Sequence, residues 1–242
     1  MTAADRTSFE ALESTIAGAV GLALSPLGTG QPIEELGTLR SGVAWSTIKV
    51  PIALAVEAEA EVRPTRRERA LMVEALTVSD NPSAEALWAS LGSPEAAAAA
   101  VERVLAAAGD TSTRVETRVV RQGFTPFGQT QWSLVAQVQL MGALPQLSYS
   151  EPIRDLMRRV VPEQRWGLGT LDEDAELKGG WGPDPDGRHL VRQMGIVSLP
   201  DGPALAVAMA TIADDGTEDS GTANLDRIAS WLGRSEAARR RP

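Results

Sequence analysis

The chain has 242 residues and a formal net charge of -9, with 43% hydrophobic and 23% charged residues. This balance is typical of a soluble globular protein and excludes a disordered or fibrous chain. The negative charge disfavours nucleic acid and anionic membranes as partners, because both require clustered cations. The chain contains no cysteine and a single histidine, which excludes disulfides, cysteine nucleophiles and multi-histidine metal sites.

The sequence also bears on membranes and export. No stretch is apolar over the length that spans a bilayer, so we expect no membrane segment. Residues 1–10 lack the cationic and apolar regions of a signal peptide. We expect a cytoplasmic chain as it stands, and an extracytoplasmic one only if a leader has been removed. Arg239, Arg240 and Arg241 are expected to form a short solvated tail.

The beginning of the chain predicts a helix followed by a strand. Phe9, Leu12 and Ile16 recur at helical spacing and favour an amphipathic helix. The apolar run at 19–24 favours a strand, and glycines in the following residues favour a loop that extends to residue 43.

A block of helices is predicted next, because helix-forming apolar segments alternate with Pro- and Gly-containing breaks. The predicted helices are 52–61, 66–76, 83–91, 94–108, 132–144 and 152–160. Pro51 is expected near the start of the first, since its ring removes a backbone donor. Residues 110–131 show no apolar period, and a connector of this length favours a functional loop.

The last third of the chain changes to strands. Apolar runs separated by turns predict strands at 176–181, 189–199 and 204–213, before a closing helix at 224–232. The order of elements predicts an α+β fold with one antiparallel sheet assembled from both chain ends, flanking terminal helices and a mostly helical insert.

This order also suggests how the chain is divided. We expect residues 1–50 and 161–242 to form a sheet subdomain and residues 51–160 to form a helical subdomain. The two parts together would make one catalytic unit.

Lysine is almost absent from the chain. Of 23 cationic side chains only two, Lys49 and Lys178, are lysines, and the others are arginines. An arginine keeps its proton near neutral pH, whereas a desolvated lysine can lose it. A role in proton transfer is therefore one that arginine cannot fill, and both lysines become candidates for it.

The first candidate site is Ser46 with Lys49. Three residues apart at a predicted helix start, they share one face, so the amine could reach the hydroxyl. A lysine with a lowered pKa can take the proton of a serine nucleophile, and free backbone donors at the helix start would stabilise an oxyanion. Spacing alone leaves open a helix-terminal serine beside a surface lysine.

The second candidate is Ser79-Asp80-Asn81, at a break between two predicted helices. In the structural interpretation Asn81 caps the next helix, with Pro82 at the first helical position. In the chemical interpretation the Ser79 hydroxyl relays a proton to a leaving nitrogen and the Asn81 amide holds a substrate amide. Taken singly, this segment leaves both interpretations open.

The third candidate is Lys178-Gly179-Gly180, in the predicted strand that opens the last third. Burying a lysine without a partner is costly. Next to two glycines it favours a cation that faces a cleft and a backbone that a ligand approaches closely. A turn with an exposed lysine is the alternative.

The combination is more specific than its parts. Ser46-Thr47-Ile48-Lys49, Ser79-Asp80-Asn81 and Lys178-Gly179-Gly180 resemble, in type and order, the three motifs of class A β-lactamases and penicillin-binding proteins. The predicted elements resemble that fold over nearly the whole chain. Gln164-Arg165-Trp166-Gly167 and Lys178-x-Gly-Trp181 resemble actinobacterial members of the family.

The resemblance implies an acyl-serine mechanism without a metal or cofactor. Ser46 would attack a carbonyl, Lys49 would activate it, and Ser79 would relay the proton with Lys178. The substrate-binding residues implied are Asn81, Gly179, Gly180 and Trp181. The backbone N–H groups of Ser46 and Trp181 would form the oxyanion hole. Asp80 would brace its loop rather than react.

Two departures from the family pattern narrow this expectation. The middle of the third motif usually carries Thr or Ser, which helps bind a substrate carboxylate, and here it is Gly179. Class A β-lactamases also carry a loop glutamate that activates the water for acyl-enzyme release. Alignment of the loop places Val119 near that position, and Glu116 is expected to be a surface charge or loop ion-pair partner.

Other residues carry less weight. No Gly-x-Ser-x-Gly elbow occurs in the chain that could supply a serine partner for His189, so a Ser-His-Asp triad is not expected. Trp45, Trp166 and Trp181 could line a cleft, although core or sheet packing explains Trp45 and Trp166 equally well.

These observations leave several functions open. The first is a serine hydrolase that acylates at Ser46 with a β-lactam, peptide or ester and releases the product slowly. The alternatives are a D,D-peptidase or esterase of the penicillin-binding type, and a non-catalytic ligand-sensing relative. The natural substrate and the oligomeric state are not determined by the sequence.

Overall fold

The computed structural model describes residues 1–60, 63–200 and 202–236. The predictions for Arg239, Arg240 and Arg241, and for the last residue of the helix at 52–61, lie outside the described residues. Across the described part of the chain, no helix combines the length and the apolar character that crossing a membrane requires.

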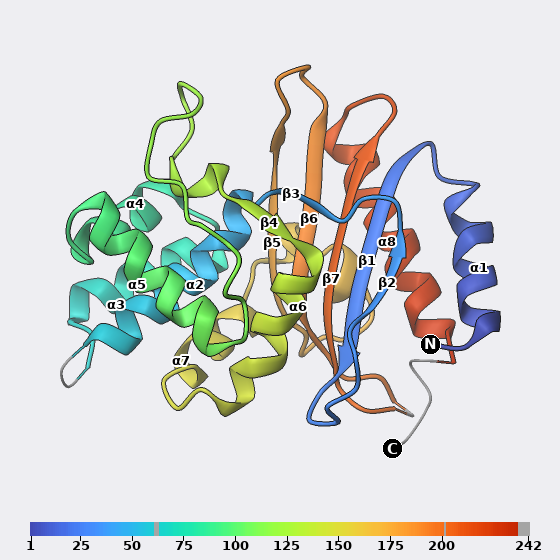
Figure 1. The fold of residues 1–242 in the computed structure, drawn as a ribbon, viewed down its shortest axis with the longest axis horizontal. Coiled ribbons are helices and arrows are strands. Elements are labelled where there is room, and N and C mark those ends of the chain that lie inside the picture. The colour runs from blue at the N-terminus through green and yellow to red at the C-terminus, as the bar shows by residue number, and fades with distance from the viewer. Residues whose placement is uncertain (61–62, 201, 237–242) are drawn as a thin grey trace.

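A five-stranded antiparallel sheet organises the molecule (Figure 1). Its strand order is β2-β1-β7-β6-β5, so the last strand is central and the first strand lies beside it. The strands are β1 (Gly18–Pro26), β2 (Glu34–Gly37), β5 (Glu176–Pro183), β6 (His189–Val197) and β7 (Leu205–Ala213). Both ends of the chain therefore build the sheet, which confirms the predicted fold class.

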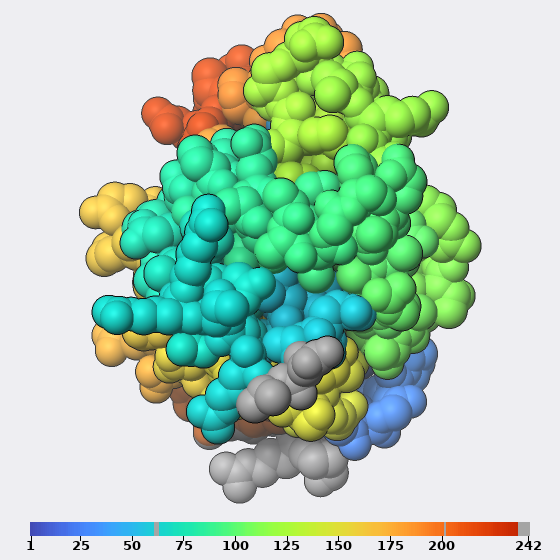
Figure 2. Space-filling view, turned by 90° about the vertical axis from the view of Figure 1, so that its left-hand side faces the viewer, coloured from blue at the N-terminus to red at the C-terminus, as the bar shows by residue number. Residues whose placement is uncertain are grey.

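Helices cover both faces of this sheet. On one side lie α1 (Ala3–Glu13) and α8 (Glu218–Arg234), and on the other lies α6 (Leu134–Ala143), which contacts β1, β6 and β7 (Figure 1). The remaining helices are α2 (Lys49–Glu59), α3 (Arg66–Thr77), α4 (Asn81–Ser90), α5 (Pro94–Ala107) and α7 (Glu151–Arg158). In the space-filling view α3, α4 and α5 cover the side that faces away from the sheet (Figure 2).

The two faces of β7 carry side chains of different size. In β7, Leu205, Val207 and Met209 join the core beneath the terminal helices, whereas Ala206 and Ala208 join the core that includes α6. Successive side chains of a strand point to opposite faces. The alanines let α6 pack closely against the sheet, and the larger residues fill the space under α1 and α8.

Several predicted boundaries differ from the structure. The predicted loop before residue 44 contains β2 and the short strand β3 (Ser41–Val43). Trp132 lies in strand β4 (Gln131–Ser133), which pairs with β3, and not in the following helix. Ile16 is buried but lies beyond the end of α1. Such short strands depend on partners distant in the sequence, so local periodicity does not reveal them. The division at residues 50 and 160 stays a prediction.

Candidate active site

Ser46 lies in a 3-10 turn, Trp45–Ile48, that leads directly into α2. The turn is held from behind: the Thr47 hydroxyl donates to the Ala44 carbonyl over 2.6 Å, and Gln137 donates to that hydroxyl over 2.9 Å. Trp45 has a φ of 49°, in the left-handed region that is unfavourable for a large side chain. This turn presents the half-buried Ser46 to a cavity of about 400 Å³. Pro51 falls in the first turn of α2, as expected.

Lys49 is almost completely buried, with 2% of its surface exposed. Its amine donates to the Ser79 carbonyl over 2.5 Å and to the Asn81 amide oxygen over 2.7 Å, and it lies 3.3 Å from the Ser79 hydroxyl. Burial lowers the pKa of Lys49 to about 8, although the charges of Asp80 and Glu85 raise it in part. An appreciable fraction of this amine is therefore neutral near physiological pH.

The segment around Ser79 and Asn81 is fixed by a helix cap. Asp80 is the N-cap of α4, and its carboxylate accepts from the Ser83 backbone N–H over 2.8 Å. Asn81 was a candidate for that cap in the sequence; the structure places it one residue later, with its side chain lining the cavity. Pro82 follows as the second helical residue. The helix cap and the cavity-lining position are thus held by two neighbouring residues.

Lys178 completes the polar cluster from the edge strand β5. It has no exposed surface, and its amine donates to the Ser79 hydroxyl over 2.9 Å and to the Gly179 carbonyl over 3.0 Å. Burial, and after it the charge of Lys49, holds the pKa of Lys178 well below its usual value. The Ser79 oxygen therefore lies between two amines. Within the described residues the Ser46 hydroxyl has no hydrogen-bond partner.

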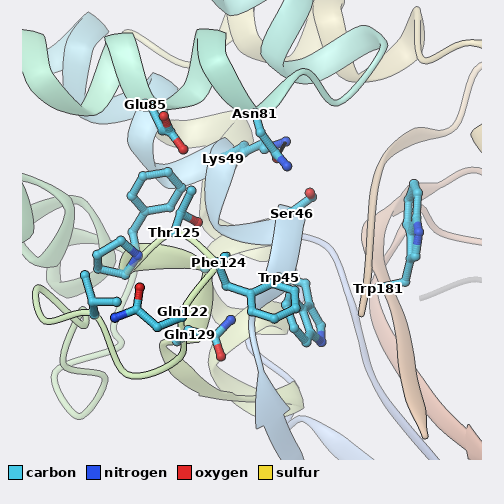
Figure 3. A pocket seen from close by; sticks show the side chains of 15 residues that line it. Trp45, Ser46, Lys49, Asn81, Glu85, Gln122, Phe124, Thr125, Gln129 and Trp181 are labelled. Carbon is cyan, nitrogen blue, oxygen red and sulfur yellow. Dashed lines mark hydrogen bonds between the residues drawn. The ribbon is translucent and has the colours of Figure 1, made fainter. Parts of the chain in front are cut away.

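Strand β5 approaches the Ser46 turn through a glycine. A Cβ atom at Gly180 would lie 2.8 Å from the Ser46 nitrogen and 2.9 Å from the Thr47 nitrogen. Both are backbone atoms, so only glycine allows the strand to pass this close. Trp181 follows and lines the cavity opposite Ser46 (Figure 3). A Cβ atom at Gly179 would instead meet the Trp166 ring at 2.7 Å, on the other face of the strand.

The loop 110–131 forms another wall of the cavity, through residues 122–129. Phe124 packs edge-on against Trp45 at 5.3 Å between ring centroids, and the Arg121 guanidinium lies 4.5 Å from the Phe124 ring centroid. Val119 also lines the cavity. Glu116 is ion-paired with Arg118 at 3.1 Å and does not line the cavity, so the prediction of a loop ion pair is confirmed.

Two cavity residues were missed in the sequence. Glu85 lies four residues after Asn81, hence on the same face of α4, and this spacing was the available signal. Gln129 is only 6% exposed, and its side-chain nitrogen has no partner although it lines the cavity. Nothing in the local sequence singles out Gln129, because its burial depends on the path of the loop.

The remaining candidates lie elsewhere. His189 is at the start of β6, where its Nδ1 lies 3.1 Å from the Gly216 carbonyl oxygen, and it does not line the cavity. Trp166 packs edge-on against Trp181 at 6.2 Å between centroids and is likewise outside the cavity lining. Among the described residues, no group of three or more His, Asp or Glu side chains is placed to hold a metal ion.

Comparison with known proteins gives a clear result for the fold. No protein-family model and no curated protein matches the sequence. A β-lactamase from Chitinophaga pinensis superposes with a TM-score of 0.76 at 20% identity, over 95% of this chain and 98% of that one. The chain has the β-lactamase fold. A β-lactamase from Burkholderia vietnamiensis matches with a TM-score of 0.72 at 20% identity, over 97% of each chain.

The TLA-3 extended-spectrum β-lactamase also matches, with a TM-score of 0.71 at 15% identity over 97% of this chain and 100% of that one. Identities this low establish the fold and not the activity. The resemblance to actinobacterial members stays a prediction.

Proposed function

We propose that the chain is a serine hydrolase that forms an acyl-enzyme at Ser46. One observation carries the proposal: Ser46 and Lys49 line the same cavity, and the Lys49 amine shares the Ser79 hydroxyl with a second buried amine, that of Lys178. Buried amines with lowered pKa values are the groups that can exchange protons with serine hydroxyls near neutral pH. A purely structural role would not require two lysines at a cost in desolvation.

The proposed acylation uses each of these groups. The Ser46 hydroxyl attacks the carbonyl carbon while its proton passes to the neutral Lys49 amine. The backbone N–H groups of Ser46 and Trp181 stabilise the oxyanion, since Gly180 brings the two segments together. The leaving nitrogen or oxygen takes a proton from the Ser79 hydroxyl. Lys178 and Lys49 then return a proton to the Ser79 oxygen. Asn81 would hold a substrate amide.

The substrate class proposed is a β-lactam, peptide or ester. The loop favours slow release of the acyl group, because alignment with the class A loop puts Val119, and not a glutamate, near the place of the water-activating acid. The same observation supports the second candidate, a D,D-peptidase or esterase of the penicillin-binding type. In both cases no metal or cofactor takes part in the proposed step.

Mass spectrometry of the intact protein tests this proposal. The chain is incubated with a penicillin and with a chromogenic cephalosporin, and the adduct and the turnover are followed together. We expect a one-to-one adduct that is lost in Ser46→Ala and kept in Ser90→Ala, an exposed serine of α4 outside the cavity. Rapid turnover would indicate an efficient β-lactamase. Neither adduct nor turnover with β-lactams or small esters would refute the hydrolase and favour the ligand-sensing alternative.

A further inference from the structure

Glu85 is the only acidic side chain among the described residues that line the cavity. It lies one helical turn after Asn81 on α4, so both side chains project from the same face of that helix. Figure 3 shows the Glu85 carboxylate directed into the cavity beside Lys49, on the side opposite Trp181. The carboxylate therefore shares the cavity with the proposed nucleophile.

The Glu85 carboxylate is free to interact with water. Within the described residues it has no hydrogen bond and no ion pair, in contrast to Glu116, which is bound to Arg118. Its charge acts on Lys49, because it is one of the two carboxylates that raise the pKa of that amine. The two side chains are thus close enough to interact electrostatically, yet too far apart for a direct ion pair.

The facing wall supplies groups that could orient a water molecule. Thr125 and Gln122 line the cavity from the loop, and their polar side chains can hydrogen-bond a water molecule there. None of the loop residues that line the cavity is acidic.

We propose that Glu85 is the general base that activates water for hydrolysis of the acyl group on Ser46. The inference rests on the proposed function. The carboxylate accepts a proton from water as the water oxygen bonds to the acyl carbon. The bond between that carbon and the Ser46 oxygen then breaks, and the oxygen takes the proton held by Glu85, relayed through water and the Lys49 amine. Ser46 is then a hydroxyl, Lys49 a neutral amine and Glu85 a carboxylate, as before acylation.

Separate measurement of acylation and release tests this role. Adduct formation with a penicillin and its decay after removal of excess penicillin are followed by intact mass, for the unmodified chain and for Glu85→Gln. We expect the adduct to form within a few-fold of the original rate, and its release to slow by about 100-fold or more, the usual contribution of a general base. Glu74→Gln on α3 is the matched control and should change neither rate.

A second variant separates chemistry from a structural effect. Glu85→Ala should also release slowly, and added formate should restore release in proportion to its concentration, because a small carboxylate can occupy the vacated space. If Glu85 had only a structural role, added formate would not restore release of the acyl group. The thermal midpoints of both variants show that the fold is intact.

The outcomes distinguish the two proposals. If the adduct forms on Ser46 and is hydrolysed at the original rate in Glu85→Gln, the role of Glu85 alone is overturned. An adduct that is not hydrolysed even in the unmodified chain also overturns it, and leaves acylation at Ser46 supported. If no adduct forms with any acylating substrate, the proposed function fails and the inference fails with it.

Discussion

The Lys178 amine donates to the Ser79 hydroxyl over 2.9 Å, although the two residues are 99 positions apart in the sequence. Lys49 approaches the same hydroxyl oxygen at 3.3 Å. Two ammonium groups around one small acceptor repel each other, so the cluster favours a state in which at least one amine is neutral. This single hydroxyl couples the two lysines, and several expectations depend on that coupling.

The first prediction concerns the pH dependence of acylation. Because the pKa of Lys49 is lowered to about 8, the rate of adduct formation should rise with pH up to about 8 and then level off. Lys49→Arg should lower the rate of adduct formation by about 100-fold or more, since arginine does not lose its proton in this pH range. Single-turnover mass measurements between pH 5 and pH 10 check both statements; an unchanged rate in Lys49→Arg would exclude Lys49 as the base.

The same pKa affects stability. Above about pH 8 the folded chain has released the Lys49 proton, while the unfolded chain holds it up to the ordinary lysine pKa of 10.5. The unfolded state then binds more protons, so the free energy of unfolding contributed by this group should increase with pH, by about 3 kcal/mol in all. Below pH 8 both states are protonated and the contribution is constant.

Denaturant unfolding of the original chain and of Lys49→Met isolates this contribution. Methionine does not titrate, so the difference between the two curves should grow between pH 8 and pH 10 and stay flat between pH 6 and pH 7.5. A difference that does not change with pH would contradict the buried, deprotonating lysine.

The second prediction separates strain from chemistry at Ser79, which has a φ of 65°. Ser79→Ala and Ser79→Gly both remove the hydroxyl, so both should lower the acylation rate by about 100-fold. Only glycine adopts a positive φ without cost, so Ser79→Gly should be about 1 kcal/mol more stable than Ser79→Ala. Urea unfolding gives the comparison, and equal stability of the two variants would argue against backbone strain.

The third prediction tests the close approach of β5 to the Ser46 turn. In Gly180→Ala the added Cβ would contact two backbone nitrogens at under 3 Å, which only a shift of the strand can relieve. We expect a loss of about 1–3 kcal/mol of stability and a larger loss of acylation, because the oxyanion donors separate.

Gly142→Ala is the matched control. In α6 the new methyl group would meet Ala206 at an ordinary distance of 3.9 Å, and alanine has the higher helix propensity. This variant should keep its activity and its stability. Full acylation activity in Gly180→Ala would show that the close approach is not needed.

The fourth prediction concerns Arg192, a buried cation that supports the site from behind. Its guanidinium donates to the carbonyls of Gly42, Val43 and Trp132 and to the Gln137 amide oxygen. Burial lowers the pKa of Arg192, but the side chain remains a cation at neutral pH. It makes no ion pair within the described residues.

Arg192→Leu would leave these buried acceptors without a donor. We expect a loss of about 3 kcal/mol or more in the free energy of unfolding, and slower acylation because Gln137 also holds Thr47. Arg103→Leu removes an exposed ion pair with Glu59 and should cost at most about 1 kcal/mol. Similar losses in both variants would contradict the network.

Much of the architecture was predictable from local pattern. The strands at 176–181, 189–199 and 204–213 and most helices lie within a few residues of their predicted positions, because apolar periodicity reports which residues face a core. Strands β3 and β4 were missed, since each has three residues and exists only through its pairing with the other. Asp80, not Asn81, became the cap because its carboxylate reaches the Ser83 backbone N–H.

The sequence by itself determined the chemical components: two lysines in the whole chain, each within a motif, and a serine before the first of them. Only the tertiary structure decided that Lys49, Ser79 and Lys178 meet, and that Glu85 is the acid among the described residues of the cavity. The physical reason is the distance along the chain over which each feature is encoded. Helix and strand periodicity is encoded in neighbouring residues, whereas a shared hydroxyl and a lowered pKa require burial, which arises when distant segments pack together.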